Sequence, residues 1–274
     1  MSALDLQTWL ARKRSEVDAL LDARLPLPTP DPGRLVEAMR YSLLAPGKRL
    51  RPILALAAAE SVGASVEEPM RVAAASVELV HCYSLIHDDL PGMDNDDFRR
   101  GRPTSHKAFG EAMAILAGDA LLTLAFGWLA EAGERANAAH RYARAMAALA
   151  RGAGMTGMVR GQARDMLRTS PATLEEIERL HAEKTGALFR AAMEVGAAVA
   201  GATPAQTEAL ARFGICYGIA FQHADDRDDN DHQAFAARAA QRIRDLVTDA
   251  TMALQEFGDA AEPLRSLAQR LDPR

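Results

Sequence analysis

Hydrophobic residues recur every three or four positions along most of the chain, which is the spacing of one face of an α-helix. Leu174, Ile177 and Leu180 share one such face, and Leu210 and Phe213 share another further along the chain. Strand-like alternation is hard to find, and the abundant alanine, leucine, arginine and glutamate favour helix. The pattern predicts an all-α protein with about ten or eleven helices joined by short turns.

The breaks between the predicted helices are local. Prolines and a glycine interrupt residues 26–33, and shorter turn signals follow near residues 91–92 and 101–103. No convincing repeat of about 30 to 45 residues occurs, which argues against a solenoid. We therefore expect residues 1–274 to form a single all-α domain.

The composition narrows the class of protein. Of the 274 residues, 49% are hydrophobic and 25% are charged, as in a soluble globular protein, and the net charge of -5 argues against nucleic-acid binding. Cys82 and Cys216 are too few for a disulfide framework, and residues 1–24 carry scattered charges instead of an export signal, so we expect a cytoplasmic protein. The most apolar segment, residues 112–130, contains Asp119, which favours a core helix over a membrane span.

A first group of acids follows the long apolar segment of residues 72–86. It includes Asp88, Asp89 and Asp94, beside a proline–glycine turn. Carboxylates this close repel one another and raise one another's pKa unless a cation lies between them. Taken alone, a run of this kind is more often a solvated acidic loop than a binding site.

A second group of acids favours the functional interpretation. Gln222, Asp225, Asp226 and Asp229 stand at offsets of three, four and seven, which places them along one face of a helix. The preceding part of that helix is apolar, and acids on a buried helix require a metal ion or a cationic ligand. Two such groups on separate helices suit Mg²⁺, which binds a few carboxylates, several waters and substrate phosphates.

Several basic residues elsewhere in the chain are further candidates, and Arg99 and Arg100 follow soon after the first acidic group. The candidates are Lys48, Arg51, His81, Arg99, Arg100 and Lys184. Taken singly, His81 is more often a packed core histidine, and Arg99 and Arg100 are more often partners of nearby acids. Together with the carboxylates, these cations indicate a site for a polyanion such as a diphosphate. The sequence contains no nucleophile elbow or reactive-cysteine context that would indicate a catalytic triad.

Several spaced motifs resemble the trans-isoprenyl diphosphate synthases (the polyprenyl synthetase family), specifically the bacterial farnesyl diphosphate synthase group. The resemblance extends from about residue 41 to residue 229, which is most of the chain. The motifs, in the order expected for the family, are GKRLRP at 47–52, DDLPGMD at 88–94, RRGRPT at 99–104, GQARD at 161–165, EKT at 183–185 and FQHADDRDD at 221–229.

The resemblance implies the isoprenoid synthase fold, in which antiparallel helices surround a central cavity, and a homodimer without nucleic-acid partners or a membrane span. It implies condensation of isopentenyl diphosphate with an allylic diphosphate, either dimethylallyl or geranyl diphosphate. Three Mg²⁺ ions would hold the allylic diphosphate through Asp88, Asp89, Asp94, Asp225, Asp226 and Asp229. Asp88, Asp89, Asp225 and Lys184 are the implied catalytic residues. Arg99, Lys184, Thr185 and Gln222 would assist the allylic diphosphate, and Lys48, Arg51, His81 and Arg100 would bind isopentenyl diphosphate.

Product length in this family depends on residues just before the first acidic motif. Tyr83 lies five positions before Asp88, and this bulky residue resembles the arrangement that stops elongation at farnesyl diphosphate. A geranyl or geranylgeranyl diphosphate synthase is the alternative within the same enzyme class.

The resemblance ends after Asp229. The family continues with a segment whose lysine reaches the allylic diphosphate, but here a block of about twenty to thirty residues is missing and no lysine follows Lys184. His223 and Arg227 also stand where the family usually has apolar residues. A weakly active or non-catalytic homologue is therefore a second alternative. A class I terpene cyclase is disfavoured, because the residues after Asp229 lack the cyclase metal motif.

Overall fold

The computed structural model describes residues 3–27, 30–167, 173–229 and 235–272. Within these residues the chain is almost entirely helical, as predicted, and the only strands are a two-residue antiparallel pair, β1 (Phe98–Arg99) and β2 (Arg102–Pro103). The α-helices are α1 (Ala3–Arg24), α2 (Leu35–Leu43), α3 (Leu50–Ser61), α4 (Glu68–Asp88), α5 (Ser105–Phe109), α6 (Glu111–Arg135), α7 (Ala139–Ala153), α8 (Met158–Asp165), α9 (Leu174–His181), α10 (Ala187–Ala200), α11 (Pro204–Asp229), α12 (Ala236–Ala253) and α13 (Glu262–Gln269).

Shorter helical segments connect some of these helices. Pro32–Arg34 and Gln255–Ala261 are 3-10 turns, and Ala182–Gly186 is a π-helix, η2, that joins α9 to α10 without a break. The structure divides the described residues into more α-helices than the ten or eleven expected, because short helices such as α5 and α8 are separate elements. A sequence pattern detects long amphipathic segments more readily than helices of one or two turns.

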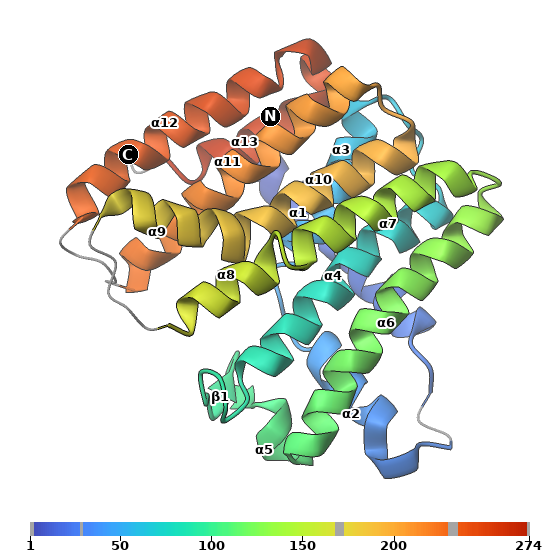
Figure 1. Cartoon of the computed structure of the whole chain (residues 1–274). Helices are drawn as coiled ribbons and strands as arrows, with labels where there is room; N and C mark the ends of the chain where they lie inside the picture. The colour runs from blue at the N-terminus through green and yellow to red at the C-terminus, as the bar shows by residue number, and fades with distance from the viewer. Residues whose placement is uncertain (1–2, 28–29, 168–172, 230–234, 273–274) are drawn as a thin grey trace.

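The centre of the bundle is formed by α4 and α10 (Figure 1). Helix α10 packs against α3, α4, α7 and α11, and eleven of its fourteen residues are buried, as expected for a helix surrounded by others. The contact with α3 is very close: a Cβ atom on Gly196 would lie 2.0 Å from the carbonyl oxygen of Ala55. Glycine at this position lets the two backbones approach each other.

Two adjacent hydrophobic clusters fill the interior. The first involves α4, α6 and α7, the second involves α11, α12 and α13, and residues of α10 belong to both. The apolar faces read from the sequence are confirmed, since Ile177, Leu210 and Phe213 are all buried. Helix α12 lies beside α11 along the outside of the second cluster (Figure 1).

Helix α6 is covered on one side only. It packs against α4 and α7, but Ile115 and Leu116 on its other side are 43% and 51% exposed. Among the helices that the structure describes, α6 is the one with the length and apolar composition of a membrane span, and one such helix is weak evidence for a span. The expectation of a core helix is therefore met for one face and not for the other.

Candidate active site

A large cavity lies between the C-terminal ends of α4 and α11, with α8, η2 and the start of α3 completing its wall. Its volume is about 950 Å³, which is sufficient for a substrate-sized molecule. Most of the residues predicted from the sequence line it: Lys48, Arg51, His81, Tyr83, Asp88, Arg99, Arg100, Lys184, Thr185, Gln222 and Asp225. Residues from five distant motifs therefore converge on one hollow.

Each acidic group contributes one aspartate to this cavity. Asp88 is the last residue of α4, and Asp225 projects from the last turns of α11. Burial raises the pKa of Asp88 to about 6, and the nearby positive charge of Lys184 only partly offsets the effect. A carboxylate in this state gains from a cation that would stabilise its charged form.

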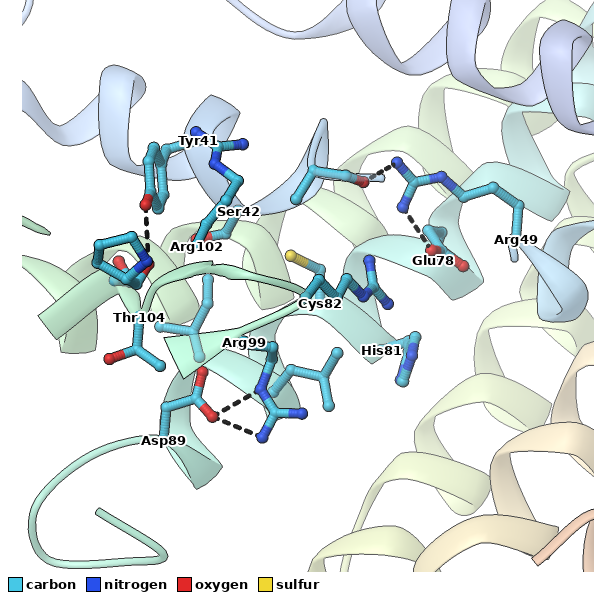
Figure 2. A pocket seen from close by; sticks show the side chains of 16 residues that line it. Tyr41, Ser42, Arg49, Glu78, His81, Cys82, Asp89, Arg99, Arg102 and Thr104 are labelled. Carbon is cyan, nitrogen blue, oxygen red and sulfur yellow. Dashed lines mark hydrogen bonds and ion pairs between the residues drawn. The ribbon is translucent and has the colours of Figure 1, made fainter. Parts of the chain in front are cut away.

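Asp89 points elsewhere. It is 3% exposed, and Arg99 donates from Nε to its Oδ1 over 2.6 Å, an interaction visible in Figure 2. Burial raises the pKa of Asp89, while the hydrogen bond from Arg99 opposes that rise. Asp89 lines a second, much smaller cavity of about 50 Å³ instead of the large one.

Two further predicted metal ligands, Asp94 and Asp226, lie outside the lining of the large cavity. Asp94 is exposed in the turn after α4, where its backbone N–H donates to the carbonyl of Asp88 over 2.9 Å. Asp226 interacts with Gln222 and with His181, whose Nε2 lies 3.1 Å from Asp226 Oδ2. The side chain of Asp229, like the segment of residues 230–234 at the apparent deletion, lies outside the described residues.

Lys184 is held at the cavity wall by α8. Its Nζ lies 2.5 Å from Oδ2 of Asp165, the last residue of α8. The two segments touch through their backbones, because a Cβ on Gly161 would lie 2.2 Å from the backbone nitrogen of Lys184. Lys184 also belongs to the π-helix η2, and such π-segments occur frequently at functional sites.

A chain of hydrogen bonds connects η2 to α11. Thr185 donates from Oγ1 to Gln222 Oε1 over 3.0 Å, and Gln222 Nε2 donates to Asp226 Oδ1 over 3.1 Å. Gln222 is thereby fixed with its oxygen and nitrogen in defined directions, because each end has its own partner. These hydrogen bonds connect Thr185 in the cavity wall to Asp226 of the second acidic group.

Two cations that line the cavity, Lys48 and Arg51, lie over aromatic rings. Lys48 Nζ lies 5.2 Å from the ring centre of Phe221, and the Arg51 guanidinium lies 4.3 Å from that of Phe189. Burial lowers the pKa of Arg51 to about 10, so the side chain remains charged at pH 7. His81 is different: burial, with the positive charge of Arg51, lowers its pKa well below the usual value, so it is neutral there.

Sequence reasoning missed the structural role of residues around Lys48. Arg49 donates from Nη1 to Glu78 Oε1 over 2.9 Å, and both side chains are 3% exposed (Figure 2). Gly47 lies against the Arg100 guanidinium, and a Cβ there would lie 2.7 Å from Arg100 Nη1, so a larger residue would displace the end of that side chain. No periodic pattern signals this pairing, because Lys48 and Arg49 lie in the turn before α3 and only Arg51 belongs to the helix.

Tyr83 lies one turn before the acids on α4. Its side chain is buried and lines the large cavity, and its ring meets the ring of His87 edge-on with centres 5.7 Å apart. His87 occupies the space above Gly118 of α6, where a Cβ would lie 2.2 Å from Nε2. The position of Tyr83 is therefore supported by a histidine and by a glycine on the neighbouring helix.

The chain is similar to two plant enzymes. It is 46% identical over 229 residues to geranylgeranyl pyrophosphate synthase 3, chloroplastic, of Arabidopsis thaliana, an alignment that covers 82% of this chain and 63% of the plant protein. The chain thus spans less than two thirds of that relative. Geranylgeranyl pyrophosphate synthase 12, chloroplastic, of the same plant is 40% identical over 271 residues, which cover 96% of this chain and 74% of the relative.

Solved bacterial structures match over almost the whole length. An FPP/GFPP synthase from Zymomonas mobilis is 40% identical with a TM-score of 0.91, covering 98% of this chain and 99% of its own. A geranyltransferase from Legionella pneumophila is 33% identical with a TM-score of 0.86, covering 98% of this chain and 97% of its own. Residues 32–246 also match the family model described as polyprenyl synthetase. This match covers well over half of the chain, which therefore belongs to the polyprenyl synthetase family.

Proposed function

We propose that this protein is a Mg²⁺-dependent prenyltransferase that condenses isopentenyl diphosphate with an allylic diphosphate, dimethylallyl or geranyl diphosphate. The observation that carries the proposal is the large cavity, in which Asp88 and Asp225 from two separate helices lie with a set of cations. Acids and basic groups lining one cavity match the needs of two diphosphates, one bound through metal and one bound directly.

The two aspartates that line the cavity, Asp88 and Asp225, suit Mg²⁺. Carboxylate oxygens are the ligands that this ion prefers. Burial raises the pKa of Asp88, and a bound cation would stabilise its charged form. Asp88 and Asp225 would hold the ions from the two walls, and Asp89, Asp94, Asp226 and Asp229 are the further ligands we propose. Three ions are expected with bound diphosphate. When bound, magnesium supplies positive charge that stabilises the diphosphate as it departs.

The protein's own cations act on the same charge. Lys184, anchored by Asp165, would contact the allylic diphosphate together with Arg99, Thr185 and Gln222. Donors fixed before the reaction stabilise developing negative charge without having to reorganise. The C–O bond to the allylic diphosphate breaks and leaves an allylic cation. The double bond of isopentenyl diphosphate attacks this cation and forms the new C–C bond, and the released diphosphate accepts the proton that the isopentenyl unit loses.

Another group of basic residues in the cavity lining would hold isopentenyl diphosphate. Lys48, Arg51 and Arg100 supply positive charge, and His81, being neutral, supplies a hydrogen bond. Apolar side chains in the cavity lining, including Phe189, would exclude water, which would otherwise capture the allylic cation.

We propose farnesyl diphosphate, with fifteen carbons, as the product. The buried ring of Tyr83 supports this choice, because it lies beside the acids where a growing tail would extend. The relatives' names support both farnesyl and longer products, since they include an FPP/GFPP synthase and geranylgeranyl pyrophosphate synthases. Geranylgeranyl or geranyl diphosphate is therefore the alternative product within the same function.

We also propose a homodimer in a reducing cytoplasm. The exposed apolar side of α6, with Ile115 and Leu116, is a surface that a second copy could cover. Both cysteines, Cys82 and Cys216, are free thiols and buried, which suits a reducing compartment.

The test is incubation with Mg²⁺, labelled isopentenyl diphosphate and either dimethylallyl or geranyl diphosphate, followed by sizing of the products. We expect a fifteen-carbon product, and Asp88→Ala should lower turnover by at least about 10³-fold. Asp259→Ala is the matched control, because Asp259 is an exposed acid that does not line the cavity. A folded protein that incorporates no label would support the non-catalytic alternative and contradict the proposal.

A further inference from the structure

A second group of potential metal ligands lies behind the cavity wall. His181 ends α9, and His223 and Asp226 lie on α11. His181 Nε2 is 3.1 Å from Asp226 Oδ2, and the two imidazole rings meet edge-on with centres 4.7 Å apart. His181 and His223 are only 4% and 2% exposed, so two imidazoles and a carboxylate share one almost buried space.

Helix geometry explains why these residues meet. His223 and Asp226 are three positions apart and share the face of α11 that packs against α9. Glu178, one turn before His181 on α9, approaches the same group, with its Oε1 3.6 Å from His223 Nε2. That separation is longer than a good hydrogen bond, and Glu178 Oε1 accepts a hydrogen bond from Arg242 Nε over 2.8 Å.

We propose that His181, His223 and Asp226 form a binding site for a transition-metal ion of the zinc class. One ligand atom from each residue lies within 4.8 Å of the other two. Tetrahedral ligands at about 2.1 Å from zinc are about 3.4 Å apart. Small side-chain rotations that bring the ligand atoms closer together by about 1.4 Å at most would therefore form the site. Two imidazoles with one carboxylate are typical of zinc, cobalt or nickel, whereas Mg²⁺ prefers oxygen ligands alone.

The surroundings can complete such a site. A small cavity of about 30 Å³ is lined by His223, Asp226 and Arg227 together with apolar residues. This volume is enough for a water molecule, which would supply the fourth ligand of a tetrahedral ion. Glu178 lies where it can accept a hydrogen bond from that ligand set and orient it, as outer carboxylates do in metal sites.

The location gives the site a consequence for turnover, and this consequence rests on the proposed function. Asp226 belongs to the acidic group that we propose for Mg²⁺, and Gln222, which lines the large cavity, donates to its Oδ1. A zinc ion on Asp226 removes that carboxylate from the magnesium set. Zinc bound at His181, His223 and Asp226 therefore inhibits the Mg²⁺-dependent reaction.

The site is tested by binding, with no substrate present. Co²⁺ is added to the full chain, the visible absorption of tetrahedral cobalt is followed, and Zn²⁺ is then added to displace it. We expect one tetrahedral Co²⁺ per chain, and at least about tenfold weaker binding for His223→Gln and for His181→Gln. His140→Gln is the control, because His140 is an exposed histidine of α7. Circular dichroism checks that each variant is folded.

Equal Co²⁺ affinity in folded His223→Gln and in the unaltered protein would overturn the proposed site, as would the absence of a tetrahedral cobalt spectrum. Inhibition is then measured with the turnover assay, in which zinc should inhibit the unaltered protein at least about tenfold more strongly than His223→Gln. Equal inhibition of the two would overturn the inhibitory role. Histidine-dependent cobalt binding by a protein without prenyl transfer would leave the site standing and contradict the proposed function alone.

Discussion

Lys184 Nζ and Asp165 Oδ2 lie 2.5 Å apart and join the π-helix η2 to the end of α8 at the wall of the large cavity. The two side chains are only 30% and 37% exposed, so the pair is partly shielded from water. Asp165 comes from one sequence motif and Lys184 from another. Their contact fixes the direction of Lys184, the residue that we expect to contact the allylic diphosphate.

Asp165→Asn tests whether this contact positions Lys184. The substitution keeps the size of the side chain but removes its charge, so Lys184 is held less firmly. Because ion pairs with this exposure contribute about 1 kcal/mol at most, we expect KM for the allylic diphosphate to rise roughly two- to fivefold, with kcat changing less. Steady-state kinetics measure both values, with Asp259→Asn, at an exposed acid outside the cavity lining, as control. An unchanged KM would mean that Asp165 has no positioning role.

Tyr83→Ala tests the control of product length. Removing the ring opens the cavity beside Asp88, so we expect products of twenty carbons or more in an extraction and sizing assay. Tyr83→Phe keeps the ring and loses only the hydroxyl group, so it should still stop at fifteen carbons. If Tyr83→Ala also gave only the fifteen-carbon product, another residue would set the limit.

Glu78→Ala tests the buried ion pair of Glu78 and Arg49 in the wall of the large cavity. The substitution leaves the Arg49 guanidinium buried without its carboxylate, although Asp18 and two backbone carbonyls remain bound to it. Breaking a buried pair from one side costs about 3–5 kcal/mol of unfolding free energy, which urea denaturation measures. The exposed pair of Arg34 and Glu37 is the control, and Glu37→Ala should leave the urea midpoint nearly unchanged. Equal midpoints for the two variants would contradict the prediction.

The raised pKa of Asp88 predicts that metal binding depends on pH. The carboxylate must lose its proton to bind an ion, and its pKa is about 6, so protons compete increasingly as pH falls below 6. We expect Mn²⁺, an oxygen-preferring ion that is visible by electron paramagnetic resonance, to bind roughly tenfold more weakly at pH 5 than at pH 7. Asp88→Asn should lose most of this difference. A flat profile in the unaltered protein would indicate an ordinary pKa.

The sequence predicted the helices and the convergence of the motifs because both depend on regular spacing. The apolar positions of α9 and α11 follow the helical period, so Ile177 and Phe213 are buried as expected. Likewise Asp225 continues the face of a buried helix, and it lines the cavity. Where one side chain's location follows from the face of its helix, sequence alone was sufficient.

The sequence could not predict features that depend on contacts between distant segments. Asp89 follows Asp88 directly, but the pairing of Asp89 with Arg99 from the hairpin turns it toward another cavity. The closeness of His181 and His223 likewise depends on how α9 packs against α11. In both cases the deciding interaction joins residues from different elements, and no periodicity along one element reveals it.

The central claim is that Asp88 and Asp225 act together on one metal-bound diphosphate. Calorimetric titration of inorganic diphosphate in the presence of Mg²⁺, with Asp88→Asn, Asp225→Asn and the double variant, tests it most directly. We predict that each single variant loses at least about tenfold in affinity and that the double variant is little worse than the weaker single one, because either loss breaks the same assembly. Independent losses that multiply in the double variant, or a single variant that binds like the unaltered protein, would contradict the claim.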